Sequence, residues 1–405
     1  MRWWVEKIIE KIFAISGLAT TVVILLMVIF LFREGFGLFR SPVVEKGFAL
    51  CVNATNPVEH VGSSTIKKIF NGVIKDWSEF SSFNEKIVLF RCEDPDKCGN
   101  MSKRYSEEEL GSDYEHLAEK LGEVIAETPG IFAFVHEEFL PKNIKGVKIL
   151  EENKIAADDF FFGLEWIPTS TPAPQFGVLP LILGTLCVSL VAILIATPLG
   201  LGVAIYLSEL SKDRLRNILK PAIELLAGIP SVVYGFFGLV VLVPMIQRAF
   251  NLPVGQTALT GSIVLAIMAL PTIITVAEDA MRSTPRTMRE ASLALGATHW
   301  QTIYKVIIPY ASSGISAAVV LGIGRAIGET MVALMVTGNA GIIPKTLLTP
   351  VRTIPATIAA ELGEAPVGGV HYQALFVLGC VLFLITLAIS IASELISKRQ
   401  HNKGL

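Results

Sequence analysis

The chain has 405 residues, of which 52% are hydrophobic and 17% are charged, and its formal net charge is −2. Together with a mean hydropathy of +0.58, this composition excludes an ordinary soluble globular protein and predicts several membrane spans. The five cysteines form no CxxC pair, which argues against a metal or redox centre, and we expect no cofactor.

Six apolar segments are long enough to cross a bilayer, since a transmembrane helix needs about 20 apolar residues. The first, residues 12–32, follows basic residues and precedes no recognisable cleavage site, which predicts an uncleaved signal anchor. The other five come after a long polar region and cover residues 176–208, 225–247, 257–277, 309–337 and 372–393.

The distribution of lysine and arginine predicts the orientation of these spans. Six spans place both termini on one side, and the short segments on that side carry most of the basic residues outside the polar region. The positive-inside rule therefore predicts cytoplasmic termini. We expect three parts: residues 1–32 with the N-terminal cytoplasmic segment and first span, an extracytoplasmic region at 33–175, and a membrane domain with five spans at 176–405.

The polar region at residues 33–175 alternates apolar strands with charged helices, which predicts a small α/β lobe inserted after the first span. Its acidic residues outnumber its basic ones, which is usual for a solvated surface and unfavourable for an open anion trap. Cys92 and Cys98 would form a disulfide if this region faces an oxidising compartment, but their spacing leaves the pairing open.

A segment on the predicted cytoplasmic side carries the most informative motif. Glu290, Ala291 and Ser292 are followed by Gly296 and then by Pro309 at the entry to the next span. The pattern predicts two short helices joined by a turn at Gly296, because glycine permits a left-handed conformation. It resembles the EAA loop of ABC importer permeases, which couples a membrane domain to a separate ATPase. The alternative is an ordinary amphipathic loop.

Two charged residues, Arg325 and Glu329, lie inside the apolar run at residues 309–337. Charges within a span are costly and usually face a bundle interior or a wet cavity. Their i, i+4 spacing places them on one helical face, where they would be able to pair. Two interpretations remain open: Arg325 meets an anion in transit, or the two residues form a structural ion pair that locks two permease subunits together.

Three further stretches narrow the resemblance: AIYLSE at residues 204–209, GIPSVVYG at 228–235 and GIGRAIGETM at 322–331. With Gly338 and Asn339 they look like the PstC-type permease subunit of the phosphate ABC importer rather than its PstA-type partner. The resemblance covers the first span and residues 176–405.

The resemblance implies an all-α membrane domain of the type I importer fold, with six transmembrane helices and an EAA loop near residues 287–309. The chain would form the pathway for phosphate with a second, PstA-type permease in the cytoplasmic (inner) membrane of a bacterium or archaeon. A PstB-type ATPase dimer and a phosphate-binding protein would be its further partners. No G-x4-GK[ST] motif occurs, so ATP would be hydrolysed by the separate ATPase and this chain is not expected to be an enzyme.

The inserted lobe is similar to one lobe of a phosphate-binding protein, through the strands expected at residues 48–53, 86–91 and 131–135. In such proteins a strand-ending arginine precedes a Ser-Gly-Thr helix start that cradles phosphate. Arg91 matches the arginine, but the loop at residues 92–100 adds three carboxylates and lacks the hydroxyl pair. The resemblance implies at most a vestigial phosphate contact at Arg91, and docking or gating above the pore is favoured.

Two other functions remain open at this point. In the first, the same type of importer would transport another oxyanion, such as sulfate, molybdate or phosphonate, although the stretch at residues 322–331 disfavours this. A membrane-anchored sensor would detect phosphate through the lobe and signal inward through the loops. A chain that binds phosphate through the lobe without supporting transport would favour the sensor.

Overall fold

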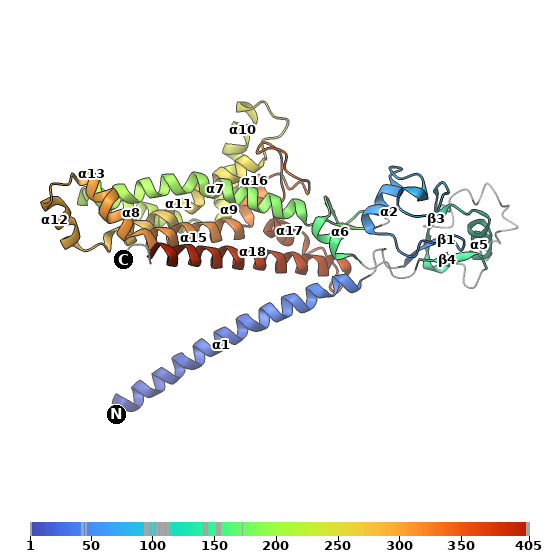
Figure 1. Ribbon diagram of the computed structural model, residues 1–405, viewed down its shortest axis with the longest axis horizontal. Coiled ribbons are helices and arrows are strands. Elements are labelled where there is room, and N and C mark those ends of the chain that lie inside the picture. Colours follow the sequence, from blue (N-terminus) through green and yellow to red (C-terminus); the bar gives the residue numbers. More distant parts are fainter. Residues whose placement is uncertain are drawn as a thin grey trace. The chain divides into compact units, whose positions relative to one another are not determined.

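The computed structural model describes residues 2–41, 44, 47–92, 98, 101, 105, 110, 114, 116–140, 145–150, 155–171 and 173–401. The chain divides into two compact units (Figure 1). The membrane unit comprises Met1–Phe32, Leu179–Val367 and Leu375–Leu405. The second unit, the lobe, comprises Arg33–Val178 and the short segment Gly368–Ala374.

The membrane unit is helical. Among the described residues, five helices are long and apolar enough to cross a membrane, and a helix pair bent by 70° makes a sixth if the pair counts as one span. The predicted α-helical membrane domain is therefore confirmed. The five helices are Ile9–Arg40, Leu179–Leu210, Ser231–Ala249, Ala258–Arg282 and Val370–Leu395, and the bent pair is His299–Tyr310 with Ser312–Gly328.

Shorter elements compose these spans and the segments between them. The α-helices are α1 Arg2–Phe36, α7 Leu179–Ile205, α8 Asp213–Ala227, α9 Ser231–Phe237, α10 Val243–Ala249, α11 Ala258–Arg282, α12 Arg286–Ala294, α13 His299–Thr302, α14 Ile308–Tyr310, α15 Ser312–Gly328, α16 Met331–Val336, α17 Ile354–Glu361 and α18 Val370–His401. The π-helical turns η5 Tyr206–Leu210, η6 Gly238–Leu242 and η7 Ile303–Ile307 continue α7, α9 and α13.

Two of the predicted spans are not continuous helices. The expected span 225–247 is interrupted between α8 and α9 at Gly228 and Pro230, because proline has no N–H to donate to a continuous helix. The expected span 309–337 bends between α14 and α15 and stops being helical after Gly328. Both spans are thus assembled from shorter helices.

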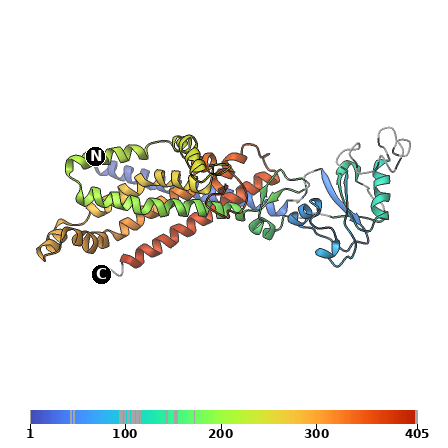
Figure 2. The same ribbon diagram turned by 90° about the horizontal axis from the view of Figure 1, so that it is seen from above.

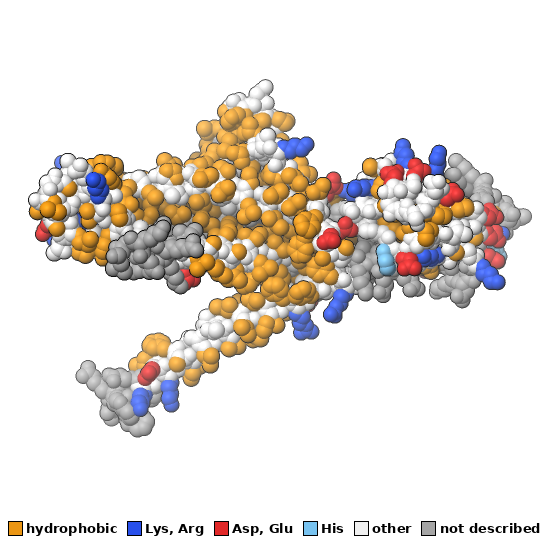
Figure 3. Space-filling model, viewed as in Figure 1, with side chains coloured by type: hydrophobic (Ala, Val, Ile, Leu, Met, Phe, Trp, Pro, Cys, Tyr) orange, Lys and Arg blue, Asp and Glu red, His pale blue; other side chains and the backbone are white. Residues whose placement is uncertain are grey.

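Helix α11 forms the centre of the membrane unit and packs between α7 and α15 (Figure 1, Figure 2). Glycines allow this close approach. A Cβ added to Gly200 of α7 would lie 2.8 Å from the side chain of Ile273 on α11, and one added to Gly322 of α15 would lie 2.9 Å from it. Apolar side chains cover most of the face of the membrane unit that Figure 3 shows in orange, which suits contact with lipid.

Helix α1 contacts the other helices of the membrane unit near its C-terminal end. The ring of Phe30 packs edge-on against Phe376 of α18 with 5.7 Å between centroids, and Phe32 meets Phe383 at 6.4 Å. Apolar side chains nearer the N-terminus are exposed, for example Phe13 at 71%. Such an exposed apolar helix suits a span surrounded by lipid.

The lobe contains the elements β1 Phe48–Asn53, α2 Ser63–Phe70, β2 Val88–Cys92, α5 Leu117–Glu127, β3 Ile131–His136, β4 Val147–Ile149, α6 Ala157–Phe162, β5 Trp166–Ile167 and β6 Gln175–Phe176. Its main sheet has the strand order β2-β3-β1-β4. Strand β3 runs parallel to β2 and antiparallel to β1, and β1 is antiparallel to β4. The sequence IFAFVH of β3 is almost entirely buried, as expected for an interior strand covered on both faces.

Two buried polar side chains of the lobe find hydrogen-bond partners. Trp77 is fully buried, and its Nε1 donates to the carbonyl of Gly130 at 2.9 Å. The Nδ2 of Asn53, at the end of β1, donates to the carbonyls of Ile125 and Ala126 near the end of α5. These bonds satisfy carbonyls that the helix end leaves free and hold α5 against the sheet.

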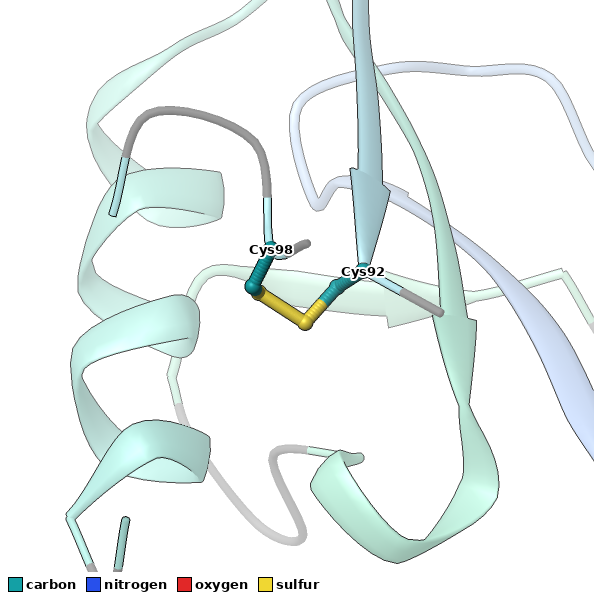
Figure 4. The surroundings of a disulfide bond; sticks show 2 residues. All are labelled: Cys92 and Cys98. Atoms are coloured by element: carbon teal, nitrogen blue, oxygen red, sulfur yellow. A yellow bond between two sulfur atoms is a disulfide. The ribbon is translucent and has the colours of Figure 1, made fainter. Parts of the chain in front are cut away.

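A disulfide joins Cys92, at the end of β2, to Cys98 (Figure 4). Both cysteines belong to a buried cluster that includes the free thiol of Cys51 on β1. Burial raises the pKa of the Cys51 thiol to about 12, so this thiol stays protonated and unreactive. The acidic loop expected to oppose anion binding, at residues 93–97, lies outside the described residues.

Candidate functional site

The segment with the EAA-type motif forms a hairpin of α12 and α13 at one end of the membrane unit (Figure 1). Helix α12 ends at Ala294. Gly296 follows with φ +84°, and the amides of Gly296 and Ala297 donate to carbonyls in the last turn of α12. A left-handed glycine of this kind ends a helix, so Gly296 lies at the turn between the two arms. The hydroxyls of Ser292 and Thr302 lie 3.0 Å apart and link the arms.

The second arm of the hairpin is anchored in the apolar core. Helix α13 begins with a capping box, in which the side chains of Thr298 and Gln301 each accept a hydrogen bond from the other residue's amide. The chain continues through η7, whose Ile303 and Ile307 are buried, and reaches Pro309 in α14. This arm is therefore fixed to the body of the membrane unit.

The first arm is exposed. Helix α12 has no buried side chain, and both Glu290 and Ala291 are exposed. The apolar side chains of Met288, Leu293 and Leu295 are exposed as well, Leu295 to 89%. An exposed apolar surface beside a carboxylate is typical of a surface that binds another protein.

A buried carboxylate ties α8 to α11. Glu278 is 1% exposed and lies 2.8 Å from Arg216 Nη2 and 2.8 Å from Lys220 Nζ, both on α8. Burial alone would lower the pKa of Lys220, but its hydrogen bonds to Asp279 and Glu278 outweigh that effect and raise the pKa. The sequence pattern alone did not single out this cluster. The sequence signal for this cluster is a carboxylate in the apolar helix α11 together with basic residues at i and i+4 on the earlier helix α8.

Arg325 lies half-buried in the last turn of α15. Its Nη1 donates to the hydroxyl of Thr272 on α11 at 3.1 Å. Within the part of the chain that the structure describes, no carboxylate forms an ion pair with its guanidinium. A positive charge on an apolar helix is thus held by a neutral hydroxyl rather than by a carboxylate.

Arg325 and Glu329 do not form the ion pair that their spacing predicted. Helix α15 ends at Gly328, and Glu329 has an extended backbone with φ −71° and ψ 126°. The i, i+4 rule requires a continuous helix between the two residues, and here the helix stops before the second one. Glu329 instead turns toward α16, where its Oε1 lies 3.5 Å from the amide of Val332.

Arg91 lies near the end of β2 with an exposed side chain. Its guanidinium carbon lies 4.7 Å from the ring centroid of Phe70, a cation–π contact. Phe70 is the last residue of α2, so Arg91 sits beside the C-terminal end of this helix. Phosphate binds at helix N-termini, where amides are free, and this contact therefore does not provide such a cradle.

The loop between α16 and α17 is held by the ion pair of Arg352 and Glu361, which the sequence pattern did not reveal. Gly338 and Asn339 both have positive φ, +85° and +48°, and reverse the chain after α16. Arg352 donates from Nε to the carbonyl of Asn339 at 3.0 Å and pairs through Nη1 with Glu361. The sequence feature that would have indicated this ion pair is the short distance along the chain, since Glu361 lies in the helix that directly follows Arg352.

Parts of this sequence are similar to those of known proteins. Residues 196–402 match the family described as "Binding-protein-dependent transport system inner membrane component". The chain is 40% identical over 266 residues to the phosphate transport system permease protein PstC of Mesorhizobium japonicum, which covers 60% of this chain and 81% of that protein. It is 37% identical over 274 residues to PstC of Haemophilus influenzae, covering 63% and 85%. A solved structure of the MetNI methionine ABC transporter, in an inward-facing conformation, is 19% identical, with a TM-score of 0.44 over 57% of this chain and 99% of that chain. The chain belongs to the family of inner membrane components of binding-protein-dependent transport systems.

Proposed function

We propose that the chain is the PstC-type permease subunit of an ATP-driven phosphate importer. It forms the translocation pathway with a second, PstA-type permease, and a phosphate-binding protein delivers the substrate. A PstB-type ATPase dimer hydrolyses ATP and engages the hairpin of α12 and α13. The identity with PstC proteins over more than four fifths of their length supports this assignment.

The environment of the Arg325 guanidinium is the observation that supports phosphate as the substrate. It belongs to an apolar span, and its described partner is the hydroxyl of Thr272 rather than a carboxylate. Guanidinium groups match the geometry of phosphate oxygens and bind them through two donors at once. A span that kept a charge only for structure would neutralise it with an acidic partner, whereas a charge that meets an anion in transit stays open.

The exposed first arm of the hairpin supports the partnership with an ATPase. Helix α12 presents Glu290 beside the apolar side chains of Met288 and Leu295, and none of its own residues is buried. A second protein that covers this arm would remove apolar surface from water, at about 25 cal/mol per Å². The anchored second arm would then pass the movement of that protein into the span that follows Pro309.

We infer that both termini and the hairpin are cytoplasmic and that the lobe is extracytoplasmic. Arg282, Arg286 and Arg289 lie in or just before the hairpin, and such basic residues favour the cytoplasmic side. The disulfide between Cys92 and Cys98 is suited to an oxidising compartment. We further propose that the lobe docks or gates above the pore, because Arg91 lies at the C-terminal end of α2, where the helix dipole does not favour phosphate.

The test is uptake of radiolabelled phosphate by the full complex in cells that lack their own phosphate importers. We expect the complex to restore uptake and a large excess of sulfate to leave it unchanged. Inhibition by sulfate, molybdate or a phosphonate would instead assign the pathway to that oxyanion. A complex that moves no solute, while its lobe binds phosphate, would contradict the importer and favour a sensor.

A further inference from the structure

One side chain of the exposed helix α12 hydrogen-bonds to the body of the membrane unit. Among the described residues of α12, Arg289 is the one whose side chain hydrogen-bonds outside the hairpin. Its Nη1 lies 2.8 Å from Oε2 of Glu209, and its Nη2 donates to the carbonyl of Met281 at 2.9 Å. The guanidinium therefore joins three elements: α12, the turn η5 that closes the span of α7, and the end of α11.

Glu209 is enclosed by protein. Its side chain is 3% exposed, and its Oε1 has no hydrogen-bond partner among the described residues. It lies in η5, and π-helical turns are frequent at functional sites. The backbone carbonyl of Glu209 also lies 3.2 Å from Nε2 of His299, on the second arm of the hairpin. Both arms thus converge on this one residue.

The character of the contact suits a joint rather than a static lock. The second arm is fixed by the buried side chains of Ile303 and Ile307, whereas the first arm has no buried side chain. A buried ion pair costs much of its attraction in desolvation, and apolar residues of similar size would often stabilise such a contact more. What a guanidinium fork provides is a fixed direction between two elements. Arg289 and Glu209 therefore hold α12 and the end of α7 in a fixed relative direction.

We propose that Arg289 and Glu209 form the joint that passes movement of the ATPase-docking helix to the span of α7. Both act as positioning residues, since neither is placed on the solute pathway. The proposal rests on the proposed function, because the ATPase supplies the movement. It adds a second route into the membrane unit, separate from the one through η7 and α14.

The chain offers a matched control. Arg216 and Glu278 also pair an arginine with a buried carboxylate near the same end of the membrane unit, at 2.8 Å. That pair joins α8 to α11 and includes no residue of the hairpin. Replacing Arg216 removes a comparable ion pair without touching the joint.

The experiment measures phosphate transported per ATP hydrolysed by the full complex in vesicles. Arg289→Gln and Glu209→Gln should each leave the subunits co-purifying and ATP hydrolysis in place, and lower this ratio about tenfold. Exchanging the two residues, with Glu209→Arg and Arg289→Glu together, should restore part of the ratio. Arg216→Gln should leave it within twofold of the unchanged complex. A ratio within twofold of normal in Arg289→Gln would overturn the proposal.

A second experiment replaces the ion pair with a covalent link, and it tests the joint even if a glutamine variant does not assemble. Glu209→Cys with Arg289→Cys is made in a chain whose three free cysteines are replaced, and that parent chain is treated identically. A reducible bis-maleimide that links the two cysteines should support coupled transport, and reduction of the linker should uncouple it, while the parent stays unchanged. Equal coupling in both states would overturn the joint. If the complex without substitutions transports another oxyanion and not phosphate, the proposed substrate is wrong, but the joint is still testable. The ratio of transported solute to hydrolysed ATP is then measured with that oxyanion.

Discussion

The hydroxyl of Thr272 on α11 accepts a hydrogen bond from Nη1 of Arg325 on α15, with 3.1 Å between the two atoms. The contact links two neighbouring helices at the centre of the membrane unit, where Gly322 allows α15 to approach Ile273 of α11. Because the hydroxyl is neutral, it directs the guanidinium without cancelling its charge. Orientation and charge are thus supplied by different residues.

Substitution at this contact should separate the two contributions. Arg325→Gln removes the charge and should lower phosphate uptake tenfold or more, because a hydrogen bond to a charged group contributes about 1.5–3 kcal/mol. Thr272→Val keeps the charge and should lower uptake less than about threefold. Initial uptake rates at matched amounts of protein in the membrane measure both. Equal losses in the two variants would show that the hydroxyl matters as much as the charge and would contradict this separation.

Removing the acidic residue nearby should have little effect on assembly. Glu329→Gln breaks no ion pair, since α15 ends before Glu329 and the carboxylate lies near the amide of Val332. The variant and Arg325→Gln with Glu329→Gln together should both co-purify with the second permease at normal yield. Loss of assembly in Glu329→Gln, rescued in the double variant, would restore the structural ion pair that this structure does not contain.

The turn of the hairpin should depend on backbone conformation alone. Gly296 has φ +84°, and a Cβ added there would meet no atom within 4 Å. Gly296→Ala should therefore cost about 1–2 kcal/mol of strain and reduce the amount of ATPase that co-purifies, whereas Gly296→Asn, which tolerates this φ better, should reduce it less. Gly202→Ala on α7 is the control, since it has open space and no positive φ. Equal retention of ATPase in all three variants would contradict this account.

Glu278→Gln should destabilise the membrane unit. The substitution leaves Arg216 and Lys220 without their buried counter-charge, and a loss of about 2 kcal/mol is expected because both cations keep some exposure to water. Thermal unfolding in detergent measures this as a lower Tm. Glu224→Gln, at an exposed position of α8, is the matched control and should leave the Tm unchanged. Similar Tm values for the two variants would show that the buried cluster is not stabilising.

Thiol labelling in intact cells tests the orientation. Cys51 is buried with its pKa raised to about 12, and Cys92 is bonded to Cys98, so the lobe should not react with an impermeant maleimide. Val73→Cys, at a lobe position that is 68% exposed, should be labelled from outside.

A hairpin position provides the opposite readout in the same experiment. Leu295→Cys, at a site that is 89% exposed, should be labelled only after the cells are opened. The unchanged chain reports any reaction of the native thiols. Labelling of Leu295→Cys in intact cells would reverse the proposed topology.

The sequence by itself determined the apolar spans and the class of the membrane domain. Runs of about 20 apolar residues are local signals, because a lipid environment requires every backbone group to be satisfied within its own helix. Strand-like runs such as Phe48–Asn53 in the lobe are equally local, and the structure has strands there. The position of Gly296 in the motif likewise marked where the chain turns.

Only the tertiary structure decided which charges meet. Arg289 and Glu209 lie 80 positions apart, and Arg216 and Glu278 lie 62 apart, so no periodicity along the chain pairs them. Arg325 and Glu329 show the reverse: their spacing indicated a pair, but α15 ends at Gly328 and separates them. Helical spacing rules hold only while the helix continues, and long-range pairs depend on how helices pack in three dimensions.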